Sequence, residues 1–286
     1  MSKMKDVLKL CLYEFRLRIV SKRVWLGYLV GIVIVLKQSA EYLAYAKSMG
    51  EAVNVLDAFI IVGNNYNTVM FFVLGWLLVI SEAPFVNNNS LYLIYRTKKK
   101  SWNQAMLLYI ILQAIIYYGL LAVSTIIFSC RNGFMANIWS KPIVELTEGA
   151  SNLLQYDVYF PYQSFIKETS VFGGFSQTWI LLFAYGLVMG LFLYTFSLLA
   201  NQIAGAVAVF TFHFLNYEIM KEGYMMIIKY SLLARSILVL QTGKETGTYV
   251  FDSYLIYGIL IILIIGLSNK IIQYVDFKEI CKGEEE

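Results

Sequence analysis

The chain has 286 residues, of which 59% are hydrophobic and only 15% are charged, and its formal net charge is +4. A soluble globular protein typically has about 45–50% apolar and about 25% charged residues. The apolar excess therefore argues against a soluble enzyme and favours a membrane protein. The modest positive charge does not indicate nucleic-acid binding, because it follows from where the lysines lie between the apolar segments.

The first 22 residues have the periodicity of an amphipathic helix. Lys5, Lys9 and Arg16 fall on one face, and the apolar residues recur at helical spacing on another. Such a helix lies in the inner membrane interface, held by its apolar face and by the attraction of its basic residues to anionic headgroups. The alternative is a charged leader that simply precedes the first span. The apolar residues are Met4, Val7, Leu8, Cys11, Phe15 and Ile19.

Six long apolar segments follow, and most of them reach or approach the roughly 20 residues that a helix needs to cross the hydrocarbon core. They comprise residues 24–36, 58–80, 102–128, 177–200, 203–220 and 249–267. Pro84, Pro142 and Pro161 all lie outside these segments, which predicts helices that run unbroken. We therefore expect an all-α integral membrane protein in which residues 1–286 form a single domain with six transmembrane helices.

The connection 81–101 separates the second and third predicted spans. It begins Ser-Glu-Ala-Pro-Phe and ends in a basic run, and the Asn and Ser residues in its middle are typical helix caps. A short helix here would present Tyr92 and Tyr95 beside the basic cluster, which favours a docking surface in the cytoplasm. The alternative is an ordinary basic segment that fixes the orientation of the neighbouring spans.

Two further connections stand out. The longest, 129–176, is expected as a large extracellular loop. It carries both acids and bases, and a connection of this length usually has its own structure or function. The segment 224–240 is apolar but contains Lys229 and Arg235, and each charge near a bilayer centre costs about 2.5–3.5 kcal/mol. We expect a re-entrant or interfacial outer segment before the last span, with a seventh span as the alternative.

The basic residues indicate the orientation. Fourteen of the 23 Lys and Arg residues lie before the first span, after the second span or after the last one. The other connections are together longer and hold fewer, so the positive-inside rule favours both termini in the cytoplasm. These 14 residues are Lys3, Lys5, Lys9, Arg16, Arg18, Lys22, Arg23, Arg96, Lys98, Lys99, Lys100, Lys270, Lys278 and Lys282.

Residues that could carry chemistry are scarce. No phosphate-binding Gly-x-x-x-x-Gly-Lys-Ser/Thr motif occurs, and the single histidine, His213, favours a helix-to-helix hydrogen bond over a metal site. Asp and Glu are almost absent from the predicted spans, which argues against a proton-coupled carrier. We therefore expect no catalytic, cofactor-binding or metal-binding residues on this chain. Cys11, Cys130 and Cys281 have no metal-ligand spacing and predict no disulfide.

Neutral polar residues gather at the start of the second span, where Asn64, Asn65, Asn67 and Thr68 are candidates for lining a pathway. The alternative is that they are simply the outer end of a helix. Elsewhere, small residues four apart in the first span (Gly27 and Gly31) and in the fourth span (Gly186 and Gly190) predict close helix packing.

Three local features together resemble a known family. The first helix contains Glu14-Phe-Arg16-Leu-Arg18, followed by Ser21-Lys22-Arg23. A basic loop, Arg96-Thr-Lys-Lys-Lys-Ser-Trp102, leads into the third span, and Asn201-Gln202 joins the fourth and fifth spans tightly. With the apolar outer segment before the last span, this architecture resembles the type-2 ATP-binding-cassette permeases, which are the membrane subunits of bacterial exporters.

The resemblance implies a permease subunit in the bacterial cell membrane that forms a homo- or heterodimer. It also implies partner subunits in the cytoplasm that hydrolyse ATP with Mg, so this chain itself is no enzyme and holds no cofactor. The helix after the second span would couple the two, and the coupling residues would be Glu82, Phe85, Tyr92, Tyr95 and Arg96. One alternative is an ATPase-independent channel or a peptide-immunity membrane protein. The other is a membrane enzyme, against which the absence of clustered acids, His and Cys argues.

Overall fold

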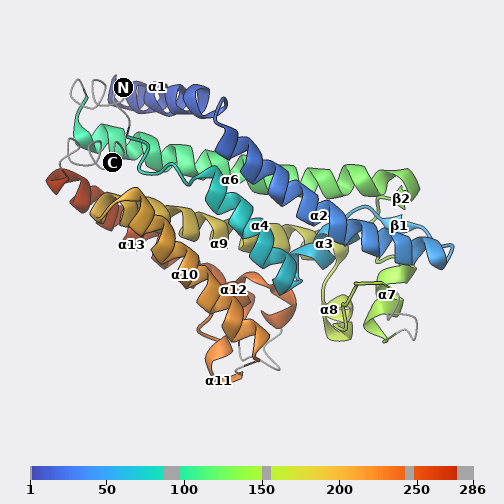
Figure 1. Ribbon diagram of the computed structural model, residues 1–286. Coiled ribbons are helices and arrows are strands. Elements are labelled where there is room, and N and C mark those ends of the chain that lie inside the picture. Colours follow the sequence, from blue (N-terminus) through green and yellow to red (C-terminus); the bar gives the residue numbers. More distant parts are fainter. Residues whose placement is uncertain (1, 87–96, 150–155, 224, 242–247, 276–286) are drawn as a thin grey trace.

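The computed structural model describes residues 2–86, 97–149, 156–223, 225–241 and 248–275 (Figure 1). The chain is 79% helical. The helices are α1 (Ser2–Arg18), α2 (Lys22–Ser48), α3 (Asp57–Gly63), α4 (Tyr66–Val79), α6 (Lys99–Ser129), η1 (Cys130–Asn132), α7 (Lys141–Thr147), α8 (Gln163–Glu168), α9 (Val171–Leu199), α10 (Gln202–Lys221), α11 (Met225–Ile228), α12 (Leu232–Ser236), η3 (Leu238–Gln241) and α13 (Val250–Tyr274). The strands β1 (Val53–Asn54) and β2 (Gly133–Phe134) pair in parallel.

Within the described residues, five helices are long and apolar enough to cross a membrane, namely α2, α6, α9, α10 and α13. A sixth crossing exists if the bent pair α3 and α4 is counted as one span. The predicted all-α architecture and its apolar segments are therefore confirmed, and the predicted first span lies within the much longer α2. The segment 225–241 contains only short helices, so the alternative of a seventh long helix is not realised there.

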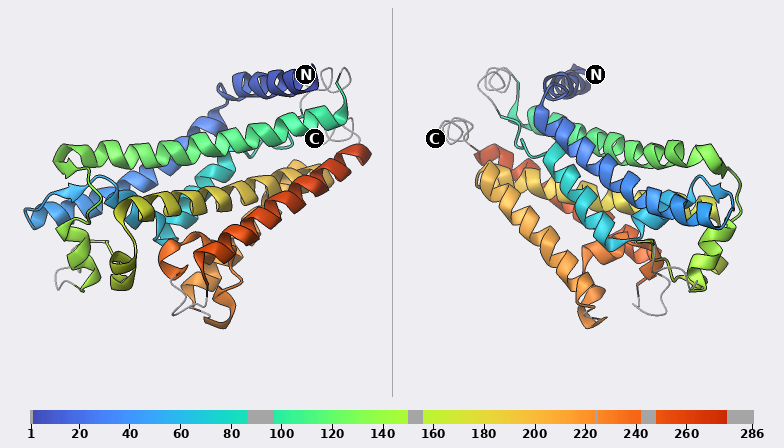
Figure 2. Two further views of the ribbon diagram at one scale, coloured as in Figure 1. Left: turned by 180° about the vertical axis from the view of Figure 1, so that it is seen from behind. Right: turned by 45° about the vertical axis from the view of Figure 1, so that its right-hand side comes forward.

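The long helices run between two ends of an elongated bundle (Figures 1 and 2). We call the end that holds α1, residues 81–86, the start of α6 and the end of α13 the terminal end. There the Lys99 ammonium group donates to the Val275 carbonyl oxygen across 2.7 Å. The opposite, distal end holds α7, α8, β1 and β2 on one side and α11, α12 and η3 on the other.

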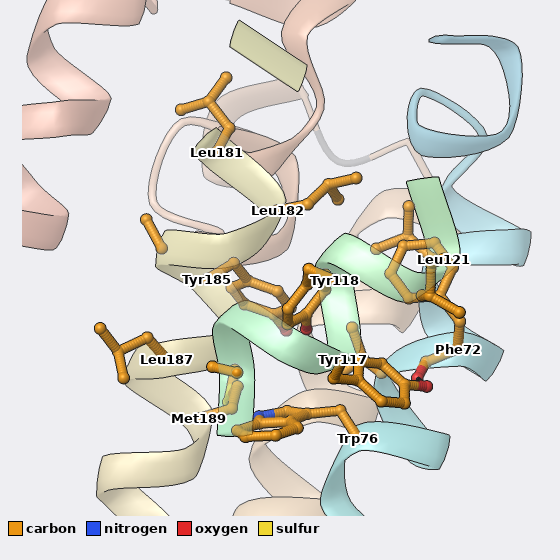
Figure 3. Packing of buried hydrophobic residues seen from close by; sticks show 14 of the residues in the cluster. Phe72, Trp76, Tyr117, Tyr118, Leu121, Leu181, Leu182, Tyr185, Leu187 and Met189 are labelled. Atoms are coloured by element: carbon orange, nitrogen blue, oxygen red, sulfur yellow. Dashed lines mark hydrogen bonds between the residues drawn. The ribbon is translucent and has the colours of Figure 1, made fainter. Parts of the chain in front are cut away.

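The centre of the bundle is an aromatic core built from α4, α6 and α9 (Figure 3). Trp76 and Tyr117 are fully buried, with ring centroids 5.6 Å apart, and Tyr117 donates its hydroxyl to the Phe72 carbonyl oxygen across 2.6 Å. Because the polar tips of these large rings bond to backbone oxygens, the rings are buried without leaving an unsatisfied donor at these two positions.

The predicted close packing at the small residues is confirmed. A Cβ atom on Gly27 would lie 2.5 Å from the Gly75 carbonyl oxygen, so α2 and α4 approach closely at this pair. On α9, a Cβ on Gly186 would overlap the Tyr118 ring, and one on Gly190 would lie 3.0 Å from Trp76. These glycines give the large aromatic side chains room to pack against backbone.

The second predicted span is not an unbroken helix, and this expectation was wrong. Helices α3 and α4 meet at an angle of 86°. No proline is needed for the break, because the Asn65 side chain accepts hydrogen bonds from the backbone N–H groups of Asn67 and Thr68 and so begins a new helix. All seven residues of α3 are buried, so this half of the span is surrounded by protein.

The long connection 129–176 has its own structure, as expected, with β2, α7 and α8 in its described part. Asn54 anchors it to β1 by donating its side-chain amide to the carbonyl oxygens of Ala136 (2.6 Å) and Ile138 (3.0 Å). Gln38 of α2 donates to the Asp157 carbonyl oxygen across 2.7 Å. The connection is therefore fastened to both α2 and β1.

The segment 225–241 folds back against the bundle as α11, α12 and η3. The Asn216 side-chain oxygen of α10 accepts from the Leu232 backbone N–H (2.8 Å), and Tyr257 of α13 donates its hydroxyl to the Leu232 carbonyl oxygen (2.6 Å). Lys229 is exposed and Arg235 is half-buried. The prediction of a segment that does not cross the bundle agrees with this arrangement.

Candidate functional site

The terminal end carries the candidate site, and α1 forms one wall of it. Helix α1 lies along the first part of α6 (Figure 1), where Leu10 and Cys11 are buried and the Phe15 ring meets the Tyr109 ring edge-on at 4.9 Å. The predicted apolar face is only partly correct, because Met4, Leu8 and Ile19 are exposed. Helix α1 thus has a second apolar surface that faces away from the bundle.

Glu14 is an acid on the buried side of α1. Its side chain is 2% exposed, and its Oε2 lies 3.4 Å from the Arg18 Nε. Burial raises the pKa of this carboxyl, and the nearby Arg18 guanidinium only partly opposes the rise. Burial also raises the pKa of the neighbouring Cys11 thiol to about 11, with a smaller contribution from the Glu14 charge.

Glu82 is held by α1 through both of its carboxylate oxygens. Arg18 forms an ion pair with Oε2, and the Ser21 hydroxyl donates to Oε1 across 2.6 Å. The Arg18 and Glu82 side chains are 12% and 20% exposed, so this pair is more shielded from solvent than a typical surface salt bridge. The segment that follows α4 is therefore fastened to the end of α1, which precedes it by about 60 residues.

Phe85 inserts its ring into the bundle directly after this ion pair. It is 1% exposed and lies between Tyr109 of α6, at a centroid distance of 5.1 Å, and Tyr194 of α9, at 6.3 Å. The Arg18 guanidinium lies over the ring at 5.3 Å. The backbone φ of Phe85 is 65°, an uncommon conformation for a bulky residue that costs about 1–2 kcal/mol. Burial of the ring offsets this cost.

A third contact fixes the same segment from the other side. Gln202, the first residue of α10, donates its side-chain amide to the Ser81 carbonyl oxygen across 2.7 Å. Residues 81–86 therefore contact α1, α6, α9 and α10 together. A force applied to this segment would act on all four helices.

Basic side chains surround this segment at the terminal end. The exposed ones in the described residues belong to α1, to the start of α2, to the start of α6 and to the end of α13. They make this end of the bundle a predominantly positive surface. The exposed residues are Lys5, Lys9, Arg16, Lys22, Arg23, Lys98, Lys99, Lys100 and Lys270.

The predicted coupling residues divide into two groups. Glu82 and Phe85 lie together at the terminal end, with the contacts given above. Tyr92, Tyr95 and Arg96 lie outside the described residues. Sequence analysis did not identify Arg18 and Ser21 as their partners, although both belong to the motif on which the family resemblance rests. The i, i+4 spacing of Glu14 and Arg18 relates only these two residues to each other. No local spacing links Arg18 or Ser21 to Glu82, because more than 60 residues separate them.

The predicted pathway residues are engaged in packing contacts. Asn64 donates to the Ile60 carbonyl oxygen (2.8 Å) and to the Thr178 hydroxyl (3.2 Å), and it accepts from the Val239 N–H (3.0 Å). The exposed Asn67 accepts from the Tyr217 hydroxyl at 3.0 Å. Asn65 caps α4, and Thr68 is buried in its first turn. Their role in a pathway stays a prediction.

The expected helix-to-helix bonding of His213 is confirmed. Its Nδ1 lies 2.6 Å from the Tyr185 hydroxyl of α9, and its Nε2 lies 3.1 Å from the Met70 carbonyl oxygen of α4. A neutral imidazole with its proton on Nε2 satisfies both bonds, because the hydroxyl then donates to Nδ1. His213 therefore joins α10 to two neighbouring helices.

A buried carboxyl group, that of Asp57, lies outside all the predicted spans and site residues. Asp57 is the first residue of α3, one position before the predicted span, and it is fully buried. Its Oδ2 accepts from the Ser140 hydroxyl at 2.5 Å and from the Tyr42 hydroxyl at 3.2 Å. These residues come from α2, α3 and the connection before α7, so only the fold brings them together.

Comparisons with protein-family models, with characterised proteins and with solved structures found no match. The class of the protein therefore rests on its own fold. It is an all-α protein with several helices that have the length and composition of membrane spans, compatible with a multi-pass membrane protein.

Proposed function

We propose that this chain is the membrane-spanning permease subunit of an ATP-binding-cassette exporter. It forms the translocation path, and its terminal end faces the cytoplasm, where it binds separate ATPase subunits. The observation that carries this proposal is the attachment of residues 81–86 to α1, α6, α9 and α10 through Glu82, Phe85 and Ser81.

This attachment gives a physical route for coupling. In the family that the sequence resembles, the segment after the second span contacts the ATPase. A displacement of that segment here pulls on Arg18 through an ion pair and on Tyr109 and Tyr194 through the Phe85 ring. Packed side chains transmit such a displacement because a close-packed interior has little free volume to absorb it.

The charge distribution supports the orientation. The exposed basic residues of α1 and of the start of α6 lie at the terminal end, as the positive-inside rule expects for a cytoplasmic face. A second permease subunit, identical or different, would complete the path in the membrane. ATP and Mg belong to the partner ATPase.

Co-purification tests the proposal. The tagged full-length chain is isolated in mild detergent from its native membranes, and the eluate is assayed for ATP hydrolysis and for an ATPase with a phosphate-binding motif. The double variant Lys98→Glu/Lys100→Glu at the terminal end should reduce the recovery of the ATPase. The control Arg131→Glu/Lys167→Glu changes two exposed basic residues of the connection 129–176 and should leave it unchanged.

A second variant tests the predicted aromatic anchors. Tyr92→Ala combined with Tyr95→Ala should uncouple ATP hydrolysis from transport while the subunit remains in the membrane, because aromatic side chains often dominate docking energies. Full ATPase association and transport in this variant would contradict the docking assignment. Ion or peptide flux through liposomes that contain the chain alone would instead support the channel or immunity alternative.

A further inference from the structure

The Asp57 cluster at the distal end is a built polar site that the proposed function does not use. It consists of Asp57, Tyr42 and Ser140, all of which are at most 2% exposed. The Tyr42 and Ser140 hydroxyl oxygens lie 3.0 Å apart, so three oxygen atoms form a closed triangle. The cluster joins α2, α3 and the connection before α7.

Ser140 does not cap α7 with its side chain, although its position in the sequence would allow this. It occupies the N-cap position of α7, where a serine hydroxyl normally accepts a hydrogen bond from the first turn. Here the side chain makes no capping bond and donates to Asp57 instead. The first turn of α7 contains Pro142, which has no backbone N–H, so it offers fewer donors for a serine cap.

The carboxyl group of Asp57 is satisfied on one side only. Oδ2 accepts both hydroxyl donors, and backbone N–H groups of Asn54 and Ser140 lie close to the carboxyl group. Oδ1 is nevertheless buried and receives no hydrogen bond of normal geometry from the described residues. No Lys or Arg in the described part of the chain forms an ion pair with Asp57. A buried carboxylate with a bare oxygen and no cation is costly, because the charge has lost its hydration.

The surrounding charged groups do not compensate for this cost. On α2, Lys37 and Lys47 are exposed, Glu41 is half-buried, and Tyr45 is the other titratable group that faces Tyr42. On α7, Lys141 pairs with Glu51 and Glu145 faces Tyr45. Helix α9 has no charged residue, and the charged residues of α6 are confined to its first turn at the terminal end.

We propose that Asp57 is a proton-binding site, with the proton carried on Oδ1. Protonation there turns Oδ2 into a carbonyl oxygen, which keeps both hydroxyl donors, so no heavy atom has to move. The added proton removes the buried charge. Loss of the proton restores the charge, and the cluster must then open to water, which releases Ser140 and the connection before α7 from α2 and α3. This site does not depend on an ATPase partner.

Infrared spectroscopy of the full-length protein in detergent tests the assignment. The carbonyl band of a protonated carboxyl group should be present at mildly acidic pH and disappear as the pH rises, and Asp57→Asn should remove its Asp57 component. The control Asp157→Asn changes an exposed aspartate of the same end and should leave the band intact. If Asp57→Asn fails to accumulate, isotopic labelling of aspartate carboxyls takes its place. A band that does not respond to the variant or to the label overturns the proposal.

Substitution of the two hydroxyl donors provides a second, independent test of the proposal. Each stabilises the ionised form, so Ser140→Ala and Tyr42→Phe should each raise the pH at which the band disappears, by about one pH unit. Ser48→Ala is the matched control, because Ser48 is an exposed serine of α2. Identical transitions in all four proteins would overturn the proposal. Loss of the wild-type band when sodium or potassium is raised at constant pH and ionic strength would assign the site to an alkali cation instead.

Discussion

Trp76 donates its indole N–H to the Gly186 carbonyl oxygen across 2.7 Å, and this bond joins α4 to α9 in the centre of the bundle. The approach is close because Gly186 has no side chain, and the Tyr118 ring occupies the place that a side chain would take. The core of this protein therefore depends on a glycine that packs against two large aromatic side chains, Trp76 and Tyr118. Figure 3 shows these two side chains among the buried residues around them.

Gly186→Ala should destabilise the protein, because the new methyl group overlaps the Tyr118 ring, which is itself buried and closely packed. Overpacking of this kind typically costs about 1–3 kcal/mol. The measurement is the thermal unfolding midpoint in detergent. Gly119→Ala is the matched control, because a Cβ at Gly119 of α6 meets nothing within 4 Å. It should leave the midpoint unchanged or raise it. Equal effects of the two substitutions would contradict this account of the core.

Glu82→Gln should loosen α1 from the segment after α4. The charge-assisted bond to Arg18 is lost, and such bonds typically contribute about 1.5–3 kcal/mol. Proteolysis within residues 19–21 should become faster in the variant. The control Glu51→Gln breaks the exposed ion pair with Lys141 and should change nothing measurable, because solvent screens that pair. Unchanged proteolysis in Glu82→Gln would show that the ion pair does not hold α1.

The attachment of α1 should weaken as the pH rises. Burial raises the folded-state pKa of Glu14 above that of the unfolded chain. The contribution of this group is therefore complete below the ordinary pKa of Glu, about 4.3, and is lost as the pH rises through the folded-state value. Glu14→Gln cannot ionise, so its unfolding midpoint relative to wild type should increase with pH. A constant difference, or the same trend in the exposed Asp6→Asn control, would argue against this role.

Native cysteines report the orientation. With Cys281 replaced by Ala, an impermeant thiol reagent applied to intact cells should label Cys130, which is exposed at the end of α6. Cys11 should not react, because it is buried and its raised pKa disfavours the thiolate. Cys130→Ala should therefore abolish labelling. Labelling of Cys130 only in inside-out vesicles would reverse the proposed orientation.

The sequence predicted the helices well, because long apolar segments are encoded locally. The break between α3 and α4 was missed because Asn65 resembles the polar end of a span until its side chain is seen to cap a new helix. The short helices of 225–241 could be anticipated only as a re-entrant or interfacial segment, since Lys229 and Arg235 argue against a span without specifying an alternative shape.

The site was less predictable than the fold. Glu82 and Phe85 were identified through the family resemblance, but their contacts with Arg18 and Tyr194 join residues that are distant in sequence. Asp57 lay one residue outside a predicted span and showed no local pattern. Its two hydroxyl donors come from Tyr42 and Ser140, and nothing in the spacing of these three residues relates them.

Helix α9 has a consequence for how the protein is made. About 78% of its most apolar stretch is buried, compared with 17% for α13, and it packs against helices that come both before and after it in the chain. If the chain enters a membrane as it is made, α10 and α13 do not yet exist when synthesis has reached only Leu199, and the faces of α9 that they will cover are then in contact with lipid. The same side chains must therefore be soluble in the bilayer first and fit a close-packed protein interior later. This double requirement accounts for a helix of 29 residues without a single charge.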